Sequence, residues 1–381
     1  MIINKIIVRP ILNSAGSYTI EAEMFSSTHK ATASVPGGLS KGINEVDTIN
    51  PNSAKEILDS IYFEITDKDF RDQKHFDDTL ISLDGTSKKS KLGGNLMLAL
   101  SITYCKLEAL VKGMETYEHI FDIFYDSSSK SEIQYRMPNM YMLILEGGLH
   151  GSGAASIQEF MAVVESIDRG IEIYNDVKEE LHKLKKSTNV GAEGAFSPDG
   201  YDNDQVLSLL TGFLHGENIA LDIASSSFPL GTEIPNYSEL IKNYPIISIE
   251  DPHSETDWAG WEIFGSKYND KLIVVTDDLT TTNPTILRDA ISRRVGNAII
   301  VKPNQIGTVS ETFDVVRMAH EHGWRTIISH RGTDTNEDFV ADLAIGVGSD
   351  SVKFGAPARG ERVSKYNRLM LIKDKIEVKN S

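Results

Sequence analysis

The spacing of apolar positions divides the 381-residue chain into two parts. Over residues 2–36 apolar and polar residues alternate, most clearly in YTIEAEMF, and turn-forming residues occupy positions 13–17. This pattern predicts antiparallel strands. Helical spacing follows over residues 53–62 and again over 94–116, where a long apolar helix is entered through the turn signal LDGTSKKSKLGG. The first part is therefore expected to be an α+β domain.

A polar stretch, DSSSKSEIQYR at positions 126–136, separates this part from the rest. After it, strand and helix patterns alternate to the end of the chain, which is typical of a parallel α/β architecture. We expect a domain boundary near Met137, with an α+β capping domain over 1–136 and a β/α barrel domain over 137–381.

Charged residues recur at a regular interval in the second part, near the ends of apolar runs such as IALDIA, IISIED and IVVTDD. The gaps between them are 29, 28, 27, 25, 28 and 23 residues, about one strand and one helix each. The positions are Glu193, Asp222, Glu250, Asp277, Lys302, His330 and Lys353. In an eight-fold β/α barrel the carboxyl ends of the strands meet on one face, so this spacing predicts a site assembled there.

Three of these residues, Asp222, Glu250 and Asp277, would bring carboxylates to one place. Like charges that close repel strongly in a partly dry cleft unless a cation lies between them. Oxygen ligands favour Mg²⁺ over zinc, which prefers His and Cys. Taken singly, each carboxylate is more often a member of an ordinary ion pair, and it is the shared interval that favours a magnesium site.

Composition limits the possible functions. The formal net charge of −17 argues against general affinity for nucleic acid or for an anionic membrane. A single cysteine, Cys105, excludes an internal disulfide and fits a reducing compartment. Lys5 and Arg9 interrupt the apolar N-terminus, so we expect no signal peptide and a cytoplasmic location. The apolar run at 92–105 is too short to span a bilayer and predicts a buried helix.

Several longer strings resemble the enolase family, the glycolytic phosphopyruvate hydratases. They are DGTSKKSKLGGN (84–95), GGLHGSGAASIQEFM (147–161), SIEDPHSETDW (248–258), TDDLTTTNP (276–284), VKPNQIGT (301–308), SHR (329–331) and FGAPARGER (354–362). The resemblance extends nearly from end to end. It implies an α+β N-terminal domain followed by a barrel of the order ββαα(βα)6, and reversible dehydration of 2-phosphoglycerate to phosphoenolpyruvate.

The resemblance also implies roles for individual residues. Asp222, Glu250 and Asp277 match ligands of a first Mg²⁺, and Ser40, in PGGLSKG, matches a loop serine that closes over a second Mg²⁺ bridged to the phosphate. Lys302 matches the base that takes the proton from carbon 2, and Glu193, in NVGAEGA, matches the acid that helps the 3-hydroxyl leave. The remaining matches are His150, Gln158, Glu159 and His330 around the leaving hydroxyl, and Lys353 and Arg331 on the substrate carboxylate and phosphate.

These roles set electrostatic requirements. A lysine is normally protonated at neutral pH, so the pKa of Lys302 must be lowered by nearby cations and by burial before it acts as a base. The pKa of Glu193 must instead be raised, which burial and the neighbouring Glu159 favour. Each residue alone has an ordinary structural interpretation, such as a strand-end lysine or a surface ion pair. The joint occurrence of these residues in the order of one family favours the catalytic interpretation.

The chain also departs from the family's usual strings. Gly332 follows the His-Arg pair where serine is usual, Glu146 begins the EGG that is commonly NGG, and Ala192 and Ala195 flank Glu193-Gly194 where DEGG is typical. The loop PGGLSKG and the segment at 13–19 also differ from the family's usual strings. Three hypotheses therefore stay open: an enolase, a superfamily enzyme acting on another carboxylate, and a catalytically weak paralogue with a binding role. A K-x-K motif near Gln158, typical of acid-sugar relatives, is missing.

The resemblance further implies an oligomer. Enolases are commonly dimers, and Arg9 matches an interface arginine of the family. We expect a homodimer or a higher homo-oligomer that binds a small phosphorylated carboxylate.

Overall fold

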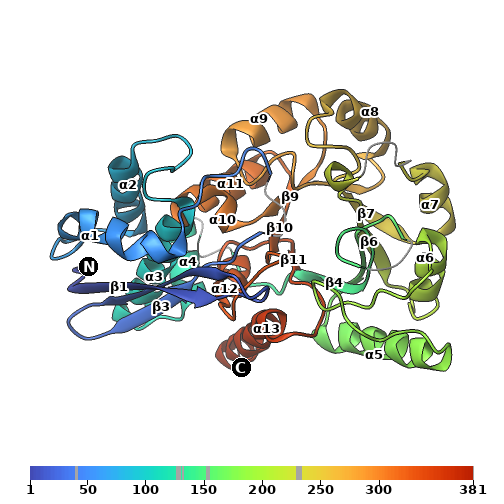
Figure 1. The fold of residues 1–381 in the computed structure, drawn as a ribbon, viewed down its shortest axis with the longest axis horizontal. Coiled ribbons are helices and arrows are strands. Elements are labelled where there is room, and N and C mark those ends of the chain that lie inside the picture. The colour runs from blue at the N-terminus through green and yellow to red at the C-terminus, as the bar shows by residue number, and fades with distance from the viewer. Residues whose placement is uncertain (39–41, 126–129, 131–132, 152–154, 229–233, 381) are drawn as a thin grey trace.

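The computed structural model describes residues 1–38, 42–125, 130, 133–151, 155–228 and 234–380. Figure 1 shows two parts, a three-stranded sheet with helices at the N-terminal side and a ring of strands surrounded by helices beyond it. The chain enters the ring at β4 and ends on the long helix α13, which lies between the ring and the sheet. The predicted α+β domain and β/α barrel are both present.

The N-terminal part contains an antiparallel meander and four helices. Its elements are β1 (Lys5–Leu12), β2 (Tyr18–Phe25), β3 (Lys30–Ser34), the 3-10 turn η1 (Pro51–Ser53), α1 (Ala54–Ile65), α2 (Gln73–Asp84), α3 (Gly94–Val111) and α4 (Thr116–Phe124). The sheet order is β1-β2-β3, with Lys5 opposite Phe25 and Glu21 opposite Ser34. Alternating side chains of β2 face α3, which explains the period of two in YTIEAEMF.

One predicted helix ends earlier than its sequence pattern suggested. The sequence pattern over 94–116 suggested a single helix, but α3 ends at Val111 and α4 begins at Thr116. Gly113 between them has φ +68°, a left-handed conformation that ends helices and that glycine adopts without strain. The apolar spacing continues across the break because both helices face the same core.

Helix α3 is the one helix in the described part of the chain that is long and apolar enough to cross a membrane. It is largely buried against β2, β3, α2 and α4. This agrees with the buried helix predicted from its sequence.

The second part is a closed barrel with the strand order β10-β11-β4-β5-β6-β7-β8-β9. The strands are β4 (Asn139–Glu146), β5 (Glu159–Val164), β6 (Asn218–Asp222), β7 (Ile246–Glu250), β8 (Ile273–Thr276), β9 (Ala298–Val301), β10 (Arg325–Ser329) and β11 (Ser351–Lys353). The helices are α5 (Ile167–Lys183), α6 (Asn203–Thr211), α7 (Tyr237–Asn243), α8 (Trp258–Tyr268), α9 (Pro284–Arg293), α10 (Pro303–Ile306), α11 (Val309–Glu321), α12 (Phe339–Gly346) and α13 (Gly360–Asn380), with a 3-10 turn η2 (Ser225–Ser227).

The barrel begins irregularly. Strand β5 runs antiparallel to both β4 and β6, whereas the remaining neighbours are parallel. Two helices, α5 and α6, then follow β5 before β6 begins, so the order is ββαα(βα)6. The parallel strands are apolar almost to their last residue, as in AIIV of β9, because both faces are covered.

The two parts are joined by buried polar contacts. Asp342 on α12 accepts a hydrogen bond from the backbone N–H of Tyr117 on α4 (3.0 Å) and another from Arg368 on α13 (2.6 Å). Arg368 also reaches Glu115, next to α4, at 3.1 Å. The N-terminal domain is therefore fixed to the barrel's last helices, and the division at 136/137 stays a prediction.

The expected oligomer also stays a prediction. Arg9 lies on β1 and forms ion pairs within its own chain, with Glu21 at 2.6 Å and Glu23 at 3.7 Å.

Candidate active site

The strand-end residues meet at one mouth of the barrel, as the interval predicted. Asp222, Glu250 and Lys353 are the last residues of β6, β7 and β11. Asp277, Lys302 and His330 directly follow β8, β9 and β10. Parallel strands end on the same side of a closed barrel, which brings these six side chains together.

Glu193 reaches the same place by another route. We expected it at the end of a strand, but it lies on a turn at 191–194 between α5 and α6. It fits the common interval because one helix and one strand, α6 and β6, lie between it and Asp222, the last residue of β6. The turn is held by backbone bonds, among them Ala356 N–H to Glu193 O at 3.2 Å.

A pocket at this mouth has an excess of negative charge. Its lining carboxylates are Glu45, Glu159, Glu193, Asp222, Asp251, Asp277 and Asp278, its fixed cations are Lys302, Arg331 and Lys353, and its other described members include His150, Gln158, His330 and Gly332. Every predicted site residue in the described part of the chain lines it, except Glu250, which is buried and pairs with Lys353. Ser40 lies outside the described residues.

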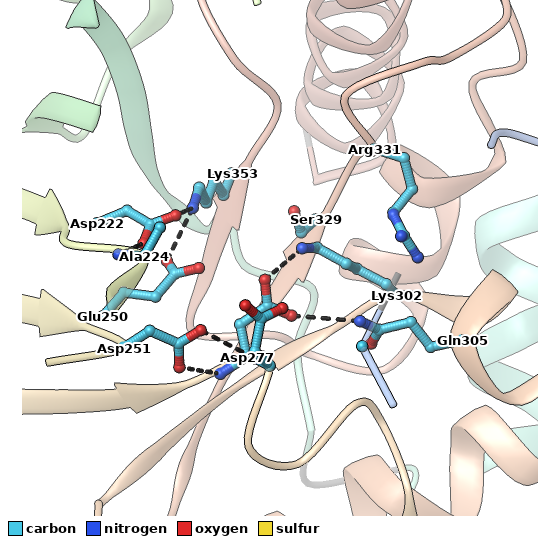
Figure 2. A network of polar contacts seen from close by, with 12 residues as sticks. Asp222, Ala224, Glu250, Asp251, Asp277, Lys302, Gln305, Ser329, Arg331 and Lys353 are labelled. Atoms are coloured by element: carbon cyan, nitrogen blue, oxygen red, sulfur yellow. Dashed lines mark hydrogen bonds and ion pairs between the residues drawn. The ribbon is translucent and has the colours of Figure 1, made fainter. Parts of the chain in front are cut away.

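Lys353 is the centre of the first cluster. Its ammonium lies 2.8 Å from Glu250, 2.9 Å from Asp222 and 3.1 Å from Glu159. Figure 2 shows it between Asp222 and Glu250. Burial alone would lower the pKa of Lys353, but the three carboxylates raise it well above its ordinary value. Lys353 is therefore charged and acts as the counter-ion of the carboxylates.

Lys302 pairs with Asp277 beside this cluster (Figure 2). Burial lowers the pKa of Lys302, as the sequence suggested, but the nearby carboxylates, Asp277 first and Glu250 after it, together outweigh burial and the net pKa is raised. Lys302 is consequently protonated in this arrangement. The expectation of a lowered pKa did not include the aspartate, and Lys302 becomes a base only when Asp277 has another partner.

The second cluster contains Glu193, His330, His150 and Glu159. His330 Nε2 lies 2.9 Å from Glu193 Oε2, and His150 Nδ1 lies 3.8 Å from Glu159 Oε1. Burial lowers the pKa of His330 to about 4. Burial raises the pKa of Glu159 to about 8, although Lys353 opposes this.

Glu193 differs from expectation in its protonation. Burial acts to raise its pKa, as predicted, but His330 and His150 outweigh burial and lower the pKa well below its ordinary value. The two imidazoles are close enough to favour the ionised carboxylate in this arrangement.

Arg331, which directly follows His330 in the sequence, also lines the pocket. Its guanidinium forms a two-pronged contact with Glu45, with both N–O distances at 3.1 Å, and donates to Asn304 Oδ1 at 3.1 Å. Glu45 belongs to the N-terminal domain, so both domains build the site. Gln158 also lines the pocket, and its backbone N–H donates to Asp222 O at 3.1 Å.

Sequence reasoning missed several members of the site. Asp251 follows Glu250 and receives the backbone N–H groups of Asp277 (3.0 Å) and Asp278 (2.9 Å). Gln305 on α10 contacts Asp277 at 3.3 Å and accepts from Thr282 at 2.6 Å. The doubled acids in SIED and TDD carried a signal for the two extra aspartates, whereas Glu45 and Gln305 had none beyond their polarity.

The carboxylates fit a hard divalent cation. Glu250 Oε1 is buried without a hydrogen-bond partner in the described part of the chain, and burial followed by Asp222 raises the pKa of Glu250 well above its ordinary value. Oxygens of Asp251, Asp277 and Asp278 also lie within 4.8 Å of one another. An oxygen-rich site with surplus negative charge and no cysteine suits Mg²⁺ better than zinc.

The fold and the site together define a class of barrel enzyme. Its pocket combines Lys302, the acidic residues Glu193 and Glu159, and carboxylates suited to a divalent metal. Comparison with known proteins narrows this class. Residues 3–120 match "Enolase, N-terminal domain", and residues 134–233 and 232–381 match "Enolase, C-terminal TIM barrel domain". The chain belongs to the enolase family.

Curated relatives agree along the whole chain. A protein named Enolase from Mycobacteroides abscessus is 36% identical over 414 aligned residues, covering 98% of this chain and 94% of that protein. A protein named Enolase from Mycobacterium leprae is 35% identical over 417 aligned residues, covering 98% and 95%. Enolase is the enzyme phosphopyruvate hydratase, a carbon–oxygen lyase.

Proposed function

We propose that this chain catalyses the Mg²⁺-dependent, reversible dehydration of 2-phosphoglycerate to phosphoenolpyruvate. The observation that supports this most directly is that Lys302, Glu193 and Arg331 line one pocket. A proton acceptor, a proton donor and a group for an anionic phosphate are the parts that this elimination requires.

The substrate's charged groups have partners in the pocket. Arg331 suits a phosphate because its planar guanidinium can donate two parallel hydrogen bonds, as it does to Glu45 here. Lys353 would hold the substrate carboxylate, and Gln158 lines the pocket nearby. Ser40 is proposed for the second metal and the phosphate.

The elimination needs two proton movements. Lys302 would take the proton from carbon 2, and the electron pair left there forms the double bond as the carbon 3 to oxygen bond breaks. Glu193 would give a proton to the departing hydroxide, so that water leaves. Because the histidines favour its ionised form in this arrangement, Glu193 must first take up that proton, which burial favours. The neighbouring Glu159, His150 and His330 would orient this acid and the hydroxyl.

A metal would be held by Asp222, Glu250 and Asp277. Bound Mg²⁺ would supply the positive charge that stabilises the doubly charged carboxylate of the intermediate and gives Asp277 an alternative partner to Lys302.

The test is the absorbance rise of phosphoenolpyruvate when the purified protein meets 2-phosphoglycerate and Mg²⁺. Removing Lys302 (Lys302→Ala) should lower kcat by about 10²- to 10⁴-fold, the usual contribution of a positioned base. A matched control is Lys55→Ala, because Lys55 is exposed and, among the residues that the structure describes, pairs only with Asp59 on α1. A chelator should abolish turnover, and added Mg²⁺ should restore it.

Lack of turnover by the folded wild-type protein would contradict the proposal. Other carboxylate substrates would then be the next to assay, because Gly332 lines the pocket at the position where the family usually has serine.

A further inference from the structure

One buried carboxyl at the site has no role in the reaction described above. Glu146 is the last residue of β4, is 2% exposed and is not among the described residues that line the pocket. It lies behind Glu193, and its Oε2 accepts a hydrogen bond from the backbone N–H of Glu193 at 3.3 Å. Glu146 therefore contacts the turn that carries the proposed acid.

Glu146 has no cation of its own among the described residues. Its Oε1 is buried without a hydrogen-bond partner. The guanidinium of Arg362, which lowers the pKa of Glu146, donates its hydrogen bonds to the backbone carbonyls of Arg331 (2.8 Å), Gly332 (2.7 Å) and Ala192 (3.4 Å). A buried carboxylate without a partner is costly, and such a group keeps its proton.

The groups that face Glu146 support the neutral form. Burial raises the pKa of Glu146 to about 9, with Glu193 on its turn and Glu159 on β5 adding to the effect, while the Glu193 N–H and Arg362 on α13 oppose it. Tyr174 on α5 lies near enough to be influenced by Glu146, and burial raises the pKa of that phenol too.

Two departures from the family's strings meet at this contact. Glu146 stands where the NGG string has asparagine, and Ala192 stands where the DEGG string has its aspartate. The hydrogen bond from Glu193 joins Glu146 to the residue next to Ala192. This chain therefore lacks the family's carboxyl at position 192, and it has an additional carboxyl, that of Glu146, in contact with the backbone of Glu193.

The neighbouring glycine makes room for this arrangement. A Cβ at Gly191 would lie 1.9 Å from Glu146 Oε1 and 2.5 Å from His150 O. The other side of the turn is held by Arg359, which donates to Gly191 O at 3.1 Å. The turn is thus fixed from both sides, by a guanidinium on its carbonyl and by a carboxyl on its N–H.

We propose that Glu146 is a positioning residue that retains a proton and fixes the 191–194 turn, so that Glu193 faces His330. This rests on the proposed function, because it assigns Glu193 the acid's place. A neutral carboxyl can accept the Glu193 N–H without repelling the Glu193 side chain, whereas an ionised one would add a second negative charge behind it.

Two variants test the role by activity. Glu146→Gln is neutral, has the same shape and keeps an oxygen for the Glu193 N–H, so kcat should stay within about threefold of wild type. Glu146→Ala removes the contact and should lower kcat about tenfold or more, with KM within about twofold, because the loss concerns the chemical step. The wild-type kcat should also fall as Glu146 ionises near pH 9, and the Gln variant should lack this decline.

A measurement without substrate tests the proton directly. At pH 8 the infrared band of protonated carboxyl groups should lose the intensity of one group in Glu146→Gln. The matched control is Asp77→Asn, since Asp77 is fully buried on α2 and its pKa, raised by burial, is about 6, so it is already ionised at pH 8. The ring signal of His330 in nuclear magnetic resonance should shift in Glu146→Ala and not in Glu146→Gln.

The outcomes separate this inference from the proposed function. If wild type fails to dehydrate 2-phosphoglycerate, the function fails, while the infrared and His330 signals still decide the role of Glu146. An unchanged carboxyl band in Glu146→Gln, or a loss of kcat in Glu146→Gln as large as in Glu146→Ala, would overturn the inference. If Glu146→Ala does not fold, as judged by circular dichroism, the Gln variant decides alone.

Discussion

The two halves of the pocket balance their negative charge in different ways. At the strand ends, Asp222, Glu250 and Asp277 are neutralised by the ammonium groups of Lys353 and Lys302. Around the 191–194 turn, Glu193 faces the imidazole of His330, and Glu146 keeps a proton. One half uses permanent cations, and the other uses a histidine and carboxyls whose pKa values are moved away from their ordinary values by burial and by one another.

This difference matches the tasks proposed for the two halves. A metal site needs carboxylates that can exchange one cation for another. An acid that protonates a leaving group needs neighbours whose protonation can change. The following predictions begin with the contact whose loss should cost most.

Replacing Lys353 by methionine should have the largest effect on stability. The change leaves Asp222, Glu159 and Glu250 buried without their counter-ion. We expect the free energy of unfolding to fall by about 3–5 kcal/mol, measured by urea unfolding with a chelator present.

The control for that change is Lys55→Met on the surface of α1, where loss of an exposed pair should cost less than about 1 kcal/mol. If Lys353→Met lowers the free energy of unfolding no more than Lys55→Met does, the carboxylates do not depend on Lys353.

Around the 191–194 turn, the buried groups should instead make the stability of the protein depend on pH. Burial lowers the pKa of His330 to about 4 from 6.5, so the folded protein binds the proton less tightly than the unfolded chain. This contribution to stability is complete above pH 6.5 and is lost as pH falls towards 4, by about 2–4 kcal/mol. In His330→Gln the loss should be absent, as measured by unfolding at several pH values.

The lowered pKa of Glu193 acts in the same acid range and depends on His330. The difference between wild type and His330→Gln therefore reports the pair. Parallel pH curves for the two proteins would mean that the ring is already charged or is not buried in solution.

Asp251→Asn should have the smallest effect. Burial, followed by Asp278 and Asp277, raises the pKa of Asp251 well above its ordinary value, so a neutral amide is a close substitute. One of its two backbone hydrogen bonds, from Asp277 or Asp278, is lost, which should cost about 0.5–1.5 kcal/mol in urea unfolding. A cost as large as that of Lys353→Met would place Asp251 among the ionised groups.

The strand-end half could be predicted from the sequence because its physics is local. A parallel strand covered on both faces is an apolar run, and the first charged residue after it marks the mouth of the barrel. Asp222, Glu250, Asp277, Lys302 and Lys353 follow this rule. The barrel and the N-terminal meander were predictable for the same reason. Apolar residues recur at every second position in strands and at about every fourth position in helices.

The turn half could not be placed this way. Glu193 follows no strand, and its neighbour Glu146 comes from a strand that is distant in sequence. The protonation of Lys302 and Glu193 was also out of reach, because it depends on which oppositely charged group lies closest. Burial was foreseen for both, but the opposing effects of Asp277 on Lys302 and of the histidines on Glu193 require coordinates.

The contacts of Asp342 bear on how such a chain can change over generations. Asp342 receives Tyr117 from one domain and Arg368 from the other, and Glu45 of the first domain meets Arg331 of the second. A recombination event that exchanged only the first 136 residues for those of a distant relative would have to preserve each of these pairings at once. We expect the two domains to be inherited and to diverge as a single block.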